Sequence, residues 1–153
     1  MGNRLGLERI IRAAATLLLL AGLSVPSAIA GAAPAPPAAQ HNLTGVWTGS
    51  YSYPDGRAPV EFLVILKEES NGKLIGALRE PNTFTNASDL FLGAWISGAV
   101  KSGQVLFTKT YDGTAGQSHS VDYKGTVNWK TRVIDGQWSL NGVIGKFRMA
   151  DHN

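Results

Sequence analysis

The chain has 153 residues, which suits one folded domain, and it has no cysteine, which excludes disulfide bonds, thiol nucleophiles and thiolate metal sites. Its formal net charge is +3, but the first thirty residues carry three arginines and one glutamate, and removing them leaves 11 basic and 10 acidic side chains. No basic run remains in that part of the chain, so we expect no nucleic-acid binding by phosphate neutralisation.

The first thirty residues have the pattern of a signal peptide. Three arginines precede an apolar run at 13–25, and Ala28-Ile29-Ala30 fits the small-x-small cleavage pattern. The run is shorter than the ~20 residues that a membrane-spanning helix needs. We expect residues 1–30 to be removed on export to the periplasm or the extracellular space, which leaves no membrane span. The alternative is a leader that is retained as a membrane anchor.

Residues 31–41 are rich in proline and alanine. These residues without periodicity predict an extended, disordered linker between the leader and the folded part. The folded domain is expected at 42–150, because a chain of ~110 residues can form a core without disulfide bonds.

Within this domain, hydrophobicity alternates with a period of two, and turn residues recur every ~8–12 positions, which favours an all-β fold. We predict eight strands, at about 43–53, 60–67, 73–80, 90–99, 104–111, 119–128, 131–140 and 142–149. Asn-Gly at 71–72 and 141–142 and Ser-Gly at 102–103 are typical of tight hairpins, because such turns need positive φ. Sequential hairpins predict an eight-stranded antiparallel up-and-down β-barrel.

Glycine placement favours this barrel over a β-sandwich. In four strands a glycine precedes an aromatic residue by two positions: Gly45 and Trp47, Gly93 and Trp95, Gly136 and Trp138, Gly145 and Phe147. Glycine weakens a strand, and alternation of bulky and absent side chains suits the curved wall of a small barrel.

Alternating strand directions separate the interior positions of the barrel into two ends. One end is apolar and collects Leu43, Trp47, Leu66, Leu74, Val105, Val127, Ile134 and Met149. The other end is polar and aromatic, and its predicted ligand-binding residues are Tyr51, Tyr53, Glu80, Lys109, Tyr111, His119 and Tyr123. The fourth strand is ambiguous, since both of its faces are apolar. An apolar floor below a polar mouth predicts a site for a small ligand.

Several of these residues have structural interpretations as well. Lys109 could pair with Glu80 instead of contacting a ligand. Trp47 and Trp138 suit a core, and Arg132 could lie on the Trp47 ring at the apolar end as a cation–π contact.

Motifs for catalysis are absent from the sequence: there is no Gly-x-Ser-x-Gly elbow and no His-Glu-x-x-His helix. Glu80 and His119 could form an acid–base pair, and Asp112, His119 and Asp122 could bind a metal ion, but no spacing requires either. We therefore predict a protein that is not an enzyme, with no catalytic residues, no metal site and no cofactor.

The segment LTGVW at 43–47 resembles the opening strand of avidins and, more generally, the Gly-x-Trp first strand of the calycin barrels, which include the lipocalins. TVNWK at 126–130 is also similar to avidins. The resemblance implies an eight-stranded barrel and, as in lipocalins, an arginine near the first tryptophan, for which Arg132 and Arg148 are candidates. Thr48-Gly49-Ser50 follow where avidins have the asparagine that contacts biotin, so the resemblance implies a barrel and not biotin binding.

The first strand also resembles that of a bacterial periplasmic protease-inhibitor barrel, in which a flexible N-terminal segment enters the protease. Residues 31–42 could be such an arm. The predicted function is therefore an exported barrel that binds a small, partly apolar ligand at its open end. The alternative is an interaction module with a protein partner.

Overall fold

The structure, a computed structural model, describes residues 41–152. The predicted signal peptide and nearly all of the predicted linker lie outside these residues. The strands are β1 (Gly45–Ser52), β2 (Val60–Glu68), β3 (Lys73–Pro81), β4 (Phe91–Lys101), β5 (Gln104–Tyr111), β6 (Ser120–Asn128), β7 (Val133–Leu140) and β8 (Val143–Asp151). Their ends differ from the predicted ones by no more than two residues. A single turn of 3₁₀ helix, η1 (Thr114–Gly116), lies between β5 and β6.

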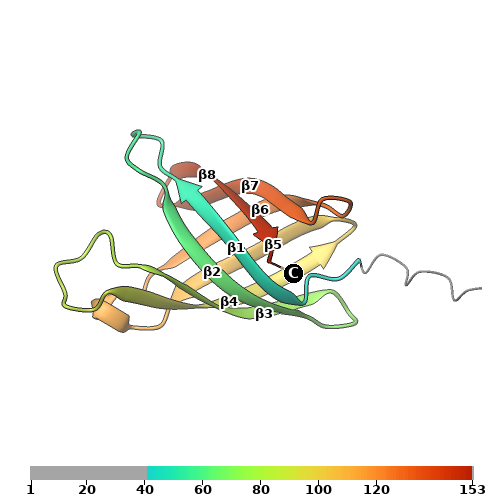
Figure 1. The fold of residues 1–153 in the computed structure, drawn as a ribbon, viewed down its shortest axis with the longest axis horizontal. Coiled ribbons are helices and arrows are strands. Elements are labelled where there is room, and N and C mark those ends of the chain that lie inside the picture. Colours follow the sequence, from blue (N-terminus) through green and yellow to red (C-terminus); the bar gives the residue numbers. More distant parts are fainter. Residues whose placement is uncertain (1–40, 153) are drawn as a thin grey trace, which may run out of the picture. The chain divides into compact units, whose positions relative to one another are not determined.

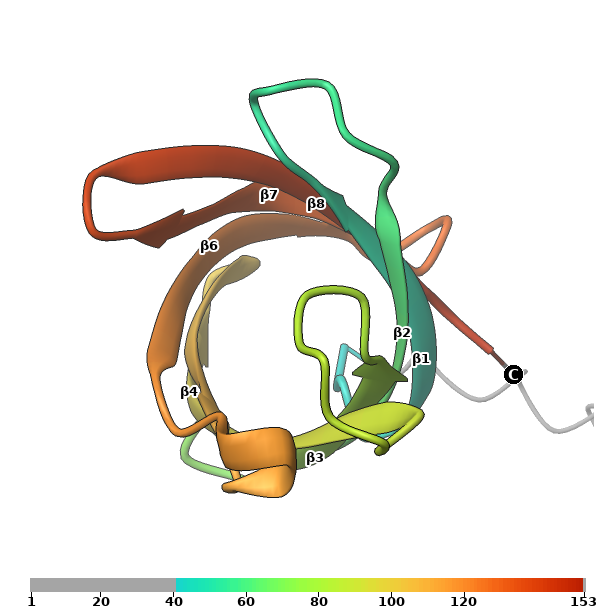
Figure 2. The same ribbon diagram turned by 90° about the vertical axis from the view of Figure 1, so that its left-hand side faces the viewer.

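The eight strands form a closed barrel in up-and-down order, as predicted (Figure 1). Each strand pairs antiparallel with the next, and β1 pairs with β8 to close the ring, which Figure 2 shows end-on. Closure leaves no strand edge unpaired in the barrel. Among the residues that the structure describes, no helix has the length and apolar character needed to cross a membrane.

Two of the predicted tight hairpins have the backbone that their residues favour. Ser102 and Gly103 have φ values of 51° and 78°, and Asn141 and Gly142 have 50° and 81°. Two consecutive positive φ values are the signature of a type I′ turn, which matches the twist of the strands that it joins.

Two of the predicted glycines, one on β7 and one on β8, make room for an aromatic ring on the neighbouring strand. Gly136 pairs with Phe147 and Gly145 with Trp138 across β7 and β8. A Cβ atom on Gly136 would lie 2.5 Å from the Phe147 ring, and one on Gly145 would lie 2.3 Å from the Trp138 ring. The space left by each glycine is therefore occupied by the ring directly across from it on the paired strand, and not by the aromatic residue two positions later in its own strand.

The residues of the predicted apolar end belong to the hydrophobic core of the barrel. All eight are buried. The indole nitrogen of Trp47 donates a hydrogen bond to the Leu43 carbonyl oxygen at 2.9 Å, and the Arg132 guanidinium lies 5.1 Å from the Trp47 ring. The predicted cation–π contact is confirmed, and of the two candidate arginines it is Arg132 that approaches this tryptophan.

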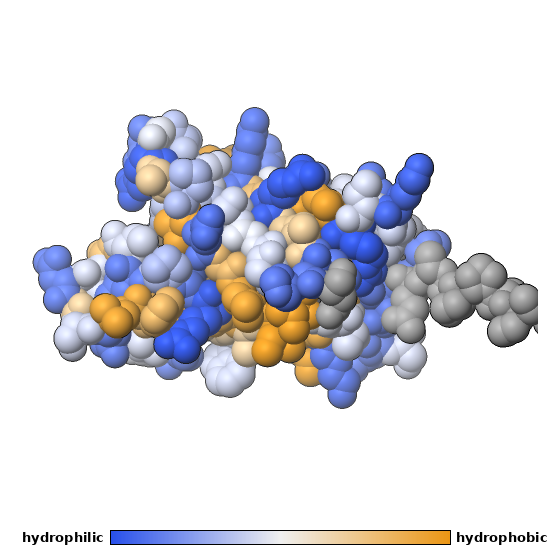
Figure 3. Space-filling model, in the orientation of Figure 1, coloured by the Kyte–Doolittle hydropathy of each residue, from blue (hydrophilic) through white to orange (hydrophobic). Residues whose placement is uncertain are grey.

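The outer wall over β2, β3 and β4 is partly apolar. Ile65, Ala77 and Trp95 are aligned across these strands, and the side chain of Trp95 is 62% exposed. Figure 3 shows apolar side chains gathered over β2 and β3 among polar ones. On β4, Leu92, Ala94 and Ile96 are the buried set. This strand was ambiguous in sequence because its exposed face is apolar too.

Candidate functional site

The end of the barrel opposite the apolar core contains a cavity of about 600 Å³. Three connections, 53–59, 82–90 and 112–119, lie at this end and are longer than those at the other. Figure 2 views the barrel from this side and shows the β3–β4 connection across part of the opening. The volume lies within the ~300–1,000 Å³ that is usual for small-molecule sites. The interior of the barrel is therefore filled by side chains at one end and hollow at the other.

One wall of the cavity is formed by aromatic rings from β1, its following loop and β7. The rings of Tyr51, Tyr53 and Trp138 meet edge to face, with centroids 5.3–6.2 Å apart. The indole nitrogen of Trp138 donates to the Ser52 carbonyl oxygen at 3.0 Å. Because this bond and the ring contacts hold Trp138 in place, the wall is an ordered aromatic surface.

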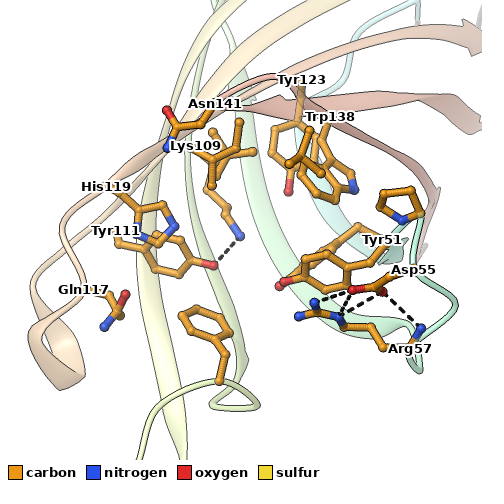
Figure 4. Close-up of a pocket in the computed structure, with 16 residues that line it drawn as sticks. Tyr51, Asp55, Arg57, Lys109, Tyr111, Gln117, His119, Tyr123, Trp138 and Asn141 are labelled. Carbon is orange, nitrogen blue, oxygen red and sulfur yellow. Dashed lines mark hydrogen bonds and ion pairs between the residues drawn. The ribbon is translucent and has the colours of Figure 1, made fainter.

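The facing wall comes from β5 and the two loops beside it. The Tyr111 and His119 rings lie 4.6 Å apart, and the Phe84 ring meets Tyr111 edge to face at 5.9 Å. Burial lowers the pKa of His119 below its ordinary value, and the nearby Lys109 ammonium adds to this decrease. His119 is therefore uncharged at neutral pH and acts here as a further flat ring (Figure 4).

Behind the cavity lies a buried ion pair held by two tyrosines. The Lys109 ammonium donates to Glu80 Oε2 and to the Tyr111 hydroxyl, each at 2.9 Å. The other oxygen of Glu80 accepts hydrogen bonds from the hydroxyls of Tyr51 and Tyr111. Lys109 and Glu80 are each only 1% exposed. Of the two interpretations of Lys109, pairing with Glu80 is observed, but Lys109 also lines the cavity, whereas Glu80 does not.

Burial sets the protonation of these groups. It raises the pKa of Tyr51 and of Tyr111 far above that of free tyrosine, and the Glu80 carboxylate raises both further. Burial lowers the pKa of Lys109, while the carboxylate opposes that decrease. The tyrosines consequently remain hydrogen-bond donors to Glu80 at any physiological pH.

The rim of the cavity carries a second, exposed charge pair. Asp55 and Arg57 form a salt bridge within the β1–β2 connection, and the Arg57 guanidinium lies 4.2 Å from the Tyr53 ring. The Arg57 hydrogen bonds hold the pKa of Asp55 below its usual value. Figure 4 shows this pair beside Tyr51, across the cavity from Tyr111 and His119.

Six of the seven predicted site residues line this one cavity: Tyr51, Tyr53, Lys109, Tyr111, His119 and Tyr123. The seventh, Glu80, lies behind the cavity surface as the partner of Lys109. Sequence reasoning missed Trp138 and Phe84 as lining residues. Trp138 could have been placed at this end from the directions of the predicted strands. β6 and β7 are antiparallel neighbours, and Trp138 lies opposite Tyr123, which was assigned to this end. No comparable signal existed for Phe84, which lies in a nine-residue loop.

The alternatives with catalytic or metal chemistry are not assembled in the described part of the chain. No hydrogen bond joins Glu80 to His119 there. Asp112 accepts from Thr114 within its own turn. Within residues 41–152, no group of three or more His, Asp or Glu side chains is placed to hold a metal ion.

Comparison of the sequence with family models and with curated proteins found no match. Among solved structures, the chain is similar to a de novo designed fluorescence-activating β-barrel. The TM-score is 0.53 at 11% sequence identity, over 74% of this chain and 97% of the designed chain. At this identity the likeness shows a shared barrel fold, and membership of the avidins or lipocalins stays a prediction from sequence.

Proposed function

We propose that this protein is an exported, non-enzymatic β-barrel that binds a small, partly apolar ligand in the cavity at its open end. The observation that carries the proposal is the hollow itself: a space of about 600 Å³ between ordered aromatic walls, with a small number of polar side chains, Lys109 among them, in its lining. Apolar cavities with few polar groups at fixed places are the usual form of small-molecule sites.

The structural comparison is consistent with this proposal. The designed barrel has the same architecture and is a fluorescence-activating protein. Export is supported by the sequence of residues 1–30, and it predicts a mature N-terminus just after Ala30. Mass measurement of the protein recovered from the medium or periplasm tests export, and an intact N-terminus in the membrane fraction would contradict it.

A calycin-type origin of the barrel belongs to the same proposal. It is supported by the Gly45-x-Trp47 strand and by the position of Arg132 on the ring of Trp47 at the closed end. These features concern folding, and the ligand does not depend on them.

Filling the cavity tests the binding function directly. Val121 lines the cavity on β6, so Val121→Trp would place an indole inside it. Ile144, on the outer face of β8, is exposed, and Ile144→Trp adds the same side chain to the outside. N-phenyl-1-naphthylamine, a neutral apolar dye that fluoresces when removed from water, serves as the ligand in fluorescence titrations.

We expect saturable binding of one dye per chain by the wild type and by Ile144→Trp, and loss of binding in Val121→Trp. Circular dichroism checks that each variant keeps its fold. Equal binding by both variants would show that the dye lies elsewhere, and an absence of binding by the wild type would contradict the proposal.

A further inference from the structure

The ammonium group of Lys109 has one more N–H than its hydrogen bonds to described residues use. A lysine ammonium has three N–H donors. Two of them point to Glu80 and Tyr111, which are its hydrogen-bond partners among the described residues. Lys109 lines the cavity and Glu80 does not, and the Lys109 nitrogen lies 4.9 Å from the centroid of the Tyr51 ring and 4.4 Å from that of the Tyr111 ring, two rings that border the hollow. The positive end of the ion pair is therefore the end nearer the hollow.

The hydroxyl of Tyr123 is a second polar group that faces the cavity. The Tyr123 side chain is 4% exposed, and its ring stacks on Phe107 at 4.7 Å. Its hydroxyl has no hydrogen-bond partner within residues 41–152. No fully buried side-chain oxygen or nitrogen in this part of the chain lacks a partner, so the Tyr123 hydroxyl is reached from the cavity. Figure 4 shows it pointing inward, below the label of its ring.

These two donors come from neighbouring strands. β5 and β6 pair with Phe107 opposite Tyr123 and with Lys109 opposite Val121, so Lys109 and Tyr123 are diagonal neighbours on the inner face. Burial raises the pKa of Tyr123, so its hydroxyl keeps its proton and can donate. A ligand oxygen placed between the two groups can accept from both.

The charges around the cavity disfavour a ligand with a formal negative charge. Lys109 is neutralised by Glu80, and at the rim Arg57 is neutralised by Asp55. An anion bound beside Lys109 would therefore bring one uncompensated charge into a site of low polarity, which is unfavourable. A neutral acceptor, such as a carbonyl oxygen, takes the free N–H without adding a charge.

We propose that the cavity binds a neutral, flat aromatic compound whose carbonyl oxygen accepts hydrogen bonds from Lys109 and Tyr123. The rings of such a compound lie between the wall of Tyr51 and Trp138 and the wall of Tyr111 and His119. This inference rests on the proposed function and names the class of ligand for the same site.

Three compounds with one two-ring frame test the inference by calorimetric titration. 2-Acetylnaphthalene carries the carbonyl, 2-ethylnaphthalene has the same shape without it, and 2-naphthoate replaces it with a carboxylate. We expect the ketone to bind at least ~10-fold more tightly than the hydrocarbon, as one hydrogen bond to a charged donor supplies. We expect the carboxylate to bind more weakly than the ketone.

Tyr123→Phe is the sharpest variant, because the hydroxyl that it removes has no partner in the described part of the protein and its loss leaves no buried group unpaired. We expect it to lower the ketone-to-hydrocarbon ratio by roughly threefold or more, with the hydrocarbon affinity unchanged. Thr108→Val is the control, because it removes a hydroxyl on the outer face of β5 that bonds to Asp122 away from the cavity, and we expect this variant to keep the ratio.

The outcomes separate the two proposals. If the hydrocarbon and the ketone bind with equal affinity, the proposed binding function stands and the inference about the carbonyl group is overturned. Tightest binding of the carboxylate, or a ratio that is unchanged in Tyr123→Phe, also overturns it. If neither the hydrocarbon nor the ketone binds, both proposals fail.

Discussion

Replacing Lys109 by methionine is expected to destabilise the barrel strongly, because it leaves the Glu80 carboxylate buried without its counter-ion. Methionine keeps the length and apolar stem of the side chain, so packing changes little. Removal of one partner of a buried ion pair destabilises proteins by about 3–5 kcal/mol. Glu80 retains the hydrogen bonds of Tyr51 and Tyr111, which stabilise its charge, and this places Lys109→Met near the lower end, at about 3 kcal/mol.

A second substitution isolates the charge. Glu80→Gln keeps an oxygen that can accept from the two tyrosines but removes the negative charge. We therefore expect the double variant Lys109→Met with Glu80→Gln to recover at least half of the loss, to within about 1.5 kcal/mol of the wild type. The free energy of unfolding, measured by urea denaturation for the four proteins of the cycle, gives the coupling between the two residues.

The exposed pair of Arg148 and Asp135 is the matched control. Its atoms are 2.8 Å apart, close to the 2.9 Å of the buried pair, but its side chains are 65% and 60% exposed. Arg148→Met should change the free energy of unfolding by less than about 1 kcal/mol. The reasoning is refuted if Lys109→Met is no more destabilising than Arg148→Met, or if the double variant is no more stable than Lys109→Met.

Two further predictions concern the core and the cavity tyrosines. Trp47→Ala should lower the free energy of unfolding by roughly 3–5 kcal/mol, whereas Trp95→Ala on the outer wall should change it by about 0.5 kcal/mol or less. Urea denaturation of both variants measures the two changes. Equal losses would contradict the assignment of Trp47 to the interior and Trp95 to the exterior of the barrel. Stability should also fall as pH rises above 10, because burial raises the pKa of Tyr51, Tyr111 and Tyr123, so the folded state holds protons that the unfolded state has lost. Each of these tyrosines lowers the free energy of unfolding by about 1.4 kcal/mol for each pH unit above the pKa of free tyrosine. The pKa of the buried Lys109 is lowered, so this residue has the opposite effect, but it offsets only one tyrosine and only up to pH 10.5, the pKa of free lysine. In an alkaline titration, the ultraviolet absorbance of tyrosinate from the buried tyrosines should therefore rise over the same pH range in which the barrel unfolds. Ionisation of all four tyrosines while the barrel stays folded would contradict this.

Alternation and turn chemistry were sufficient to predict the eight strands and their order. A one-residue shift in a strand would move every side chain to the other face, so a consistent apolar set on one face fixes the register. The same logic separated the apolar end from the polar one, since strand direction in a meander follows from counting hairpins. It could not decide β4, where Trp95 and Phe91 make the outer face apolar, because periodicity carries information only when the two faces differ.

The cavity itself could not be predicted from the sequence. Its volume depends on how far the loops fold over the mouth and on whether aromatic rings pack against each other or across the lumen. Phe84 shows this limit, because its contact with Tyr111 is made by a loop without periodicity. The pairing of Lys109 with Glu80 was one of two open interpretations, since sequence separates the two residues by 29 positions and says nothing of the distance between their side chains.

Native mass spectrometry of the protein purified from its own host tests the central claim most directly. The account predicts one added small, uncharged molecule per chain in the wild type and none in Val121→Trp, whose indole fills the cavity. The bare mass of the chain in both proteins, or the same added mass in both, would contradict the claim that this cavity is a ligand-binding site.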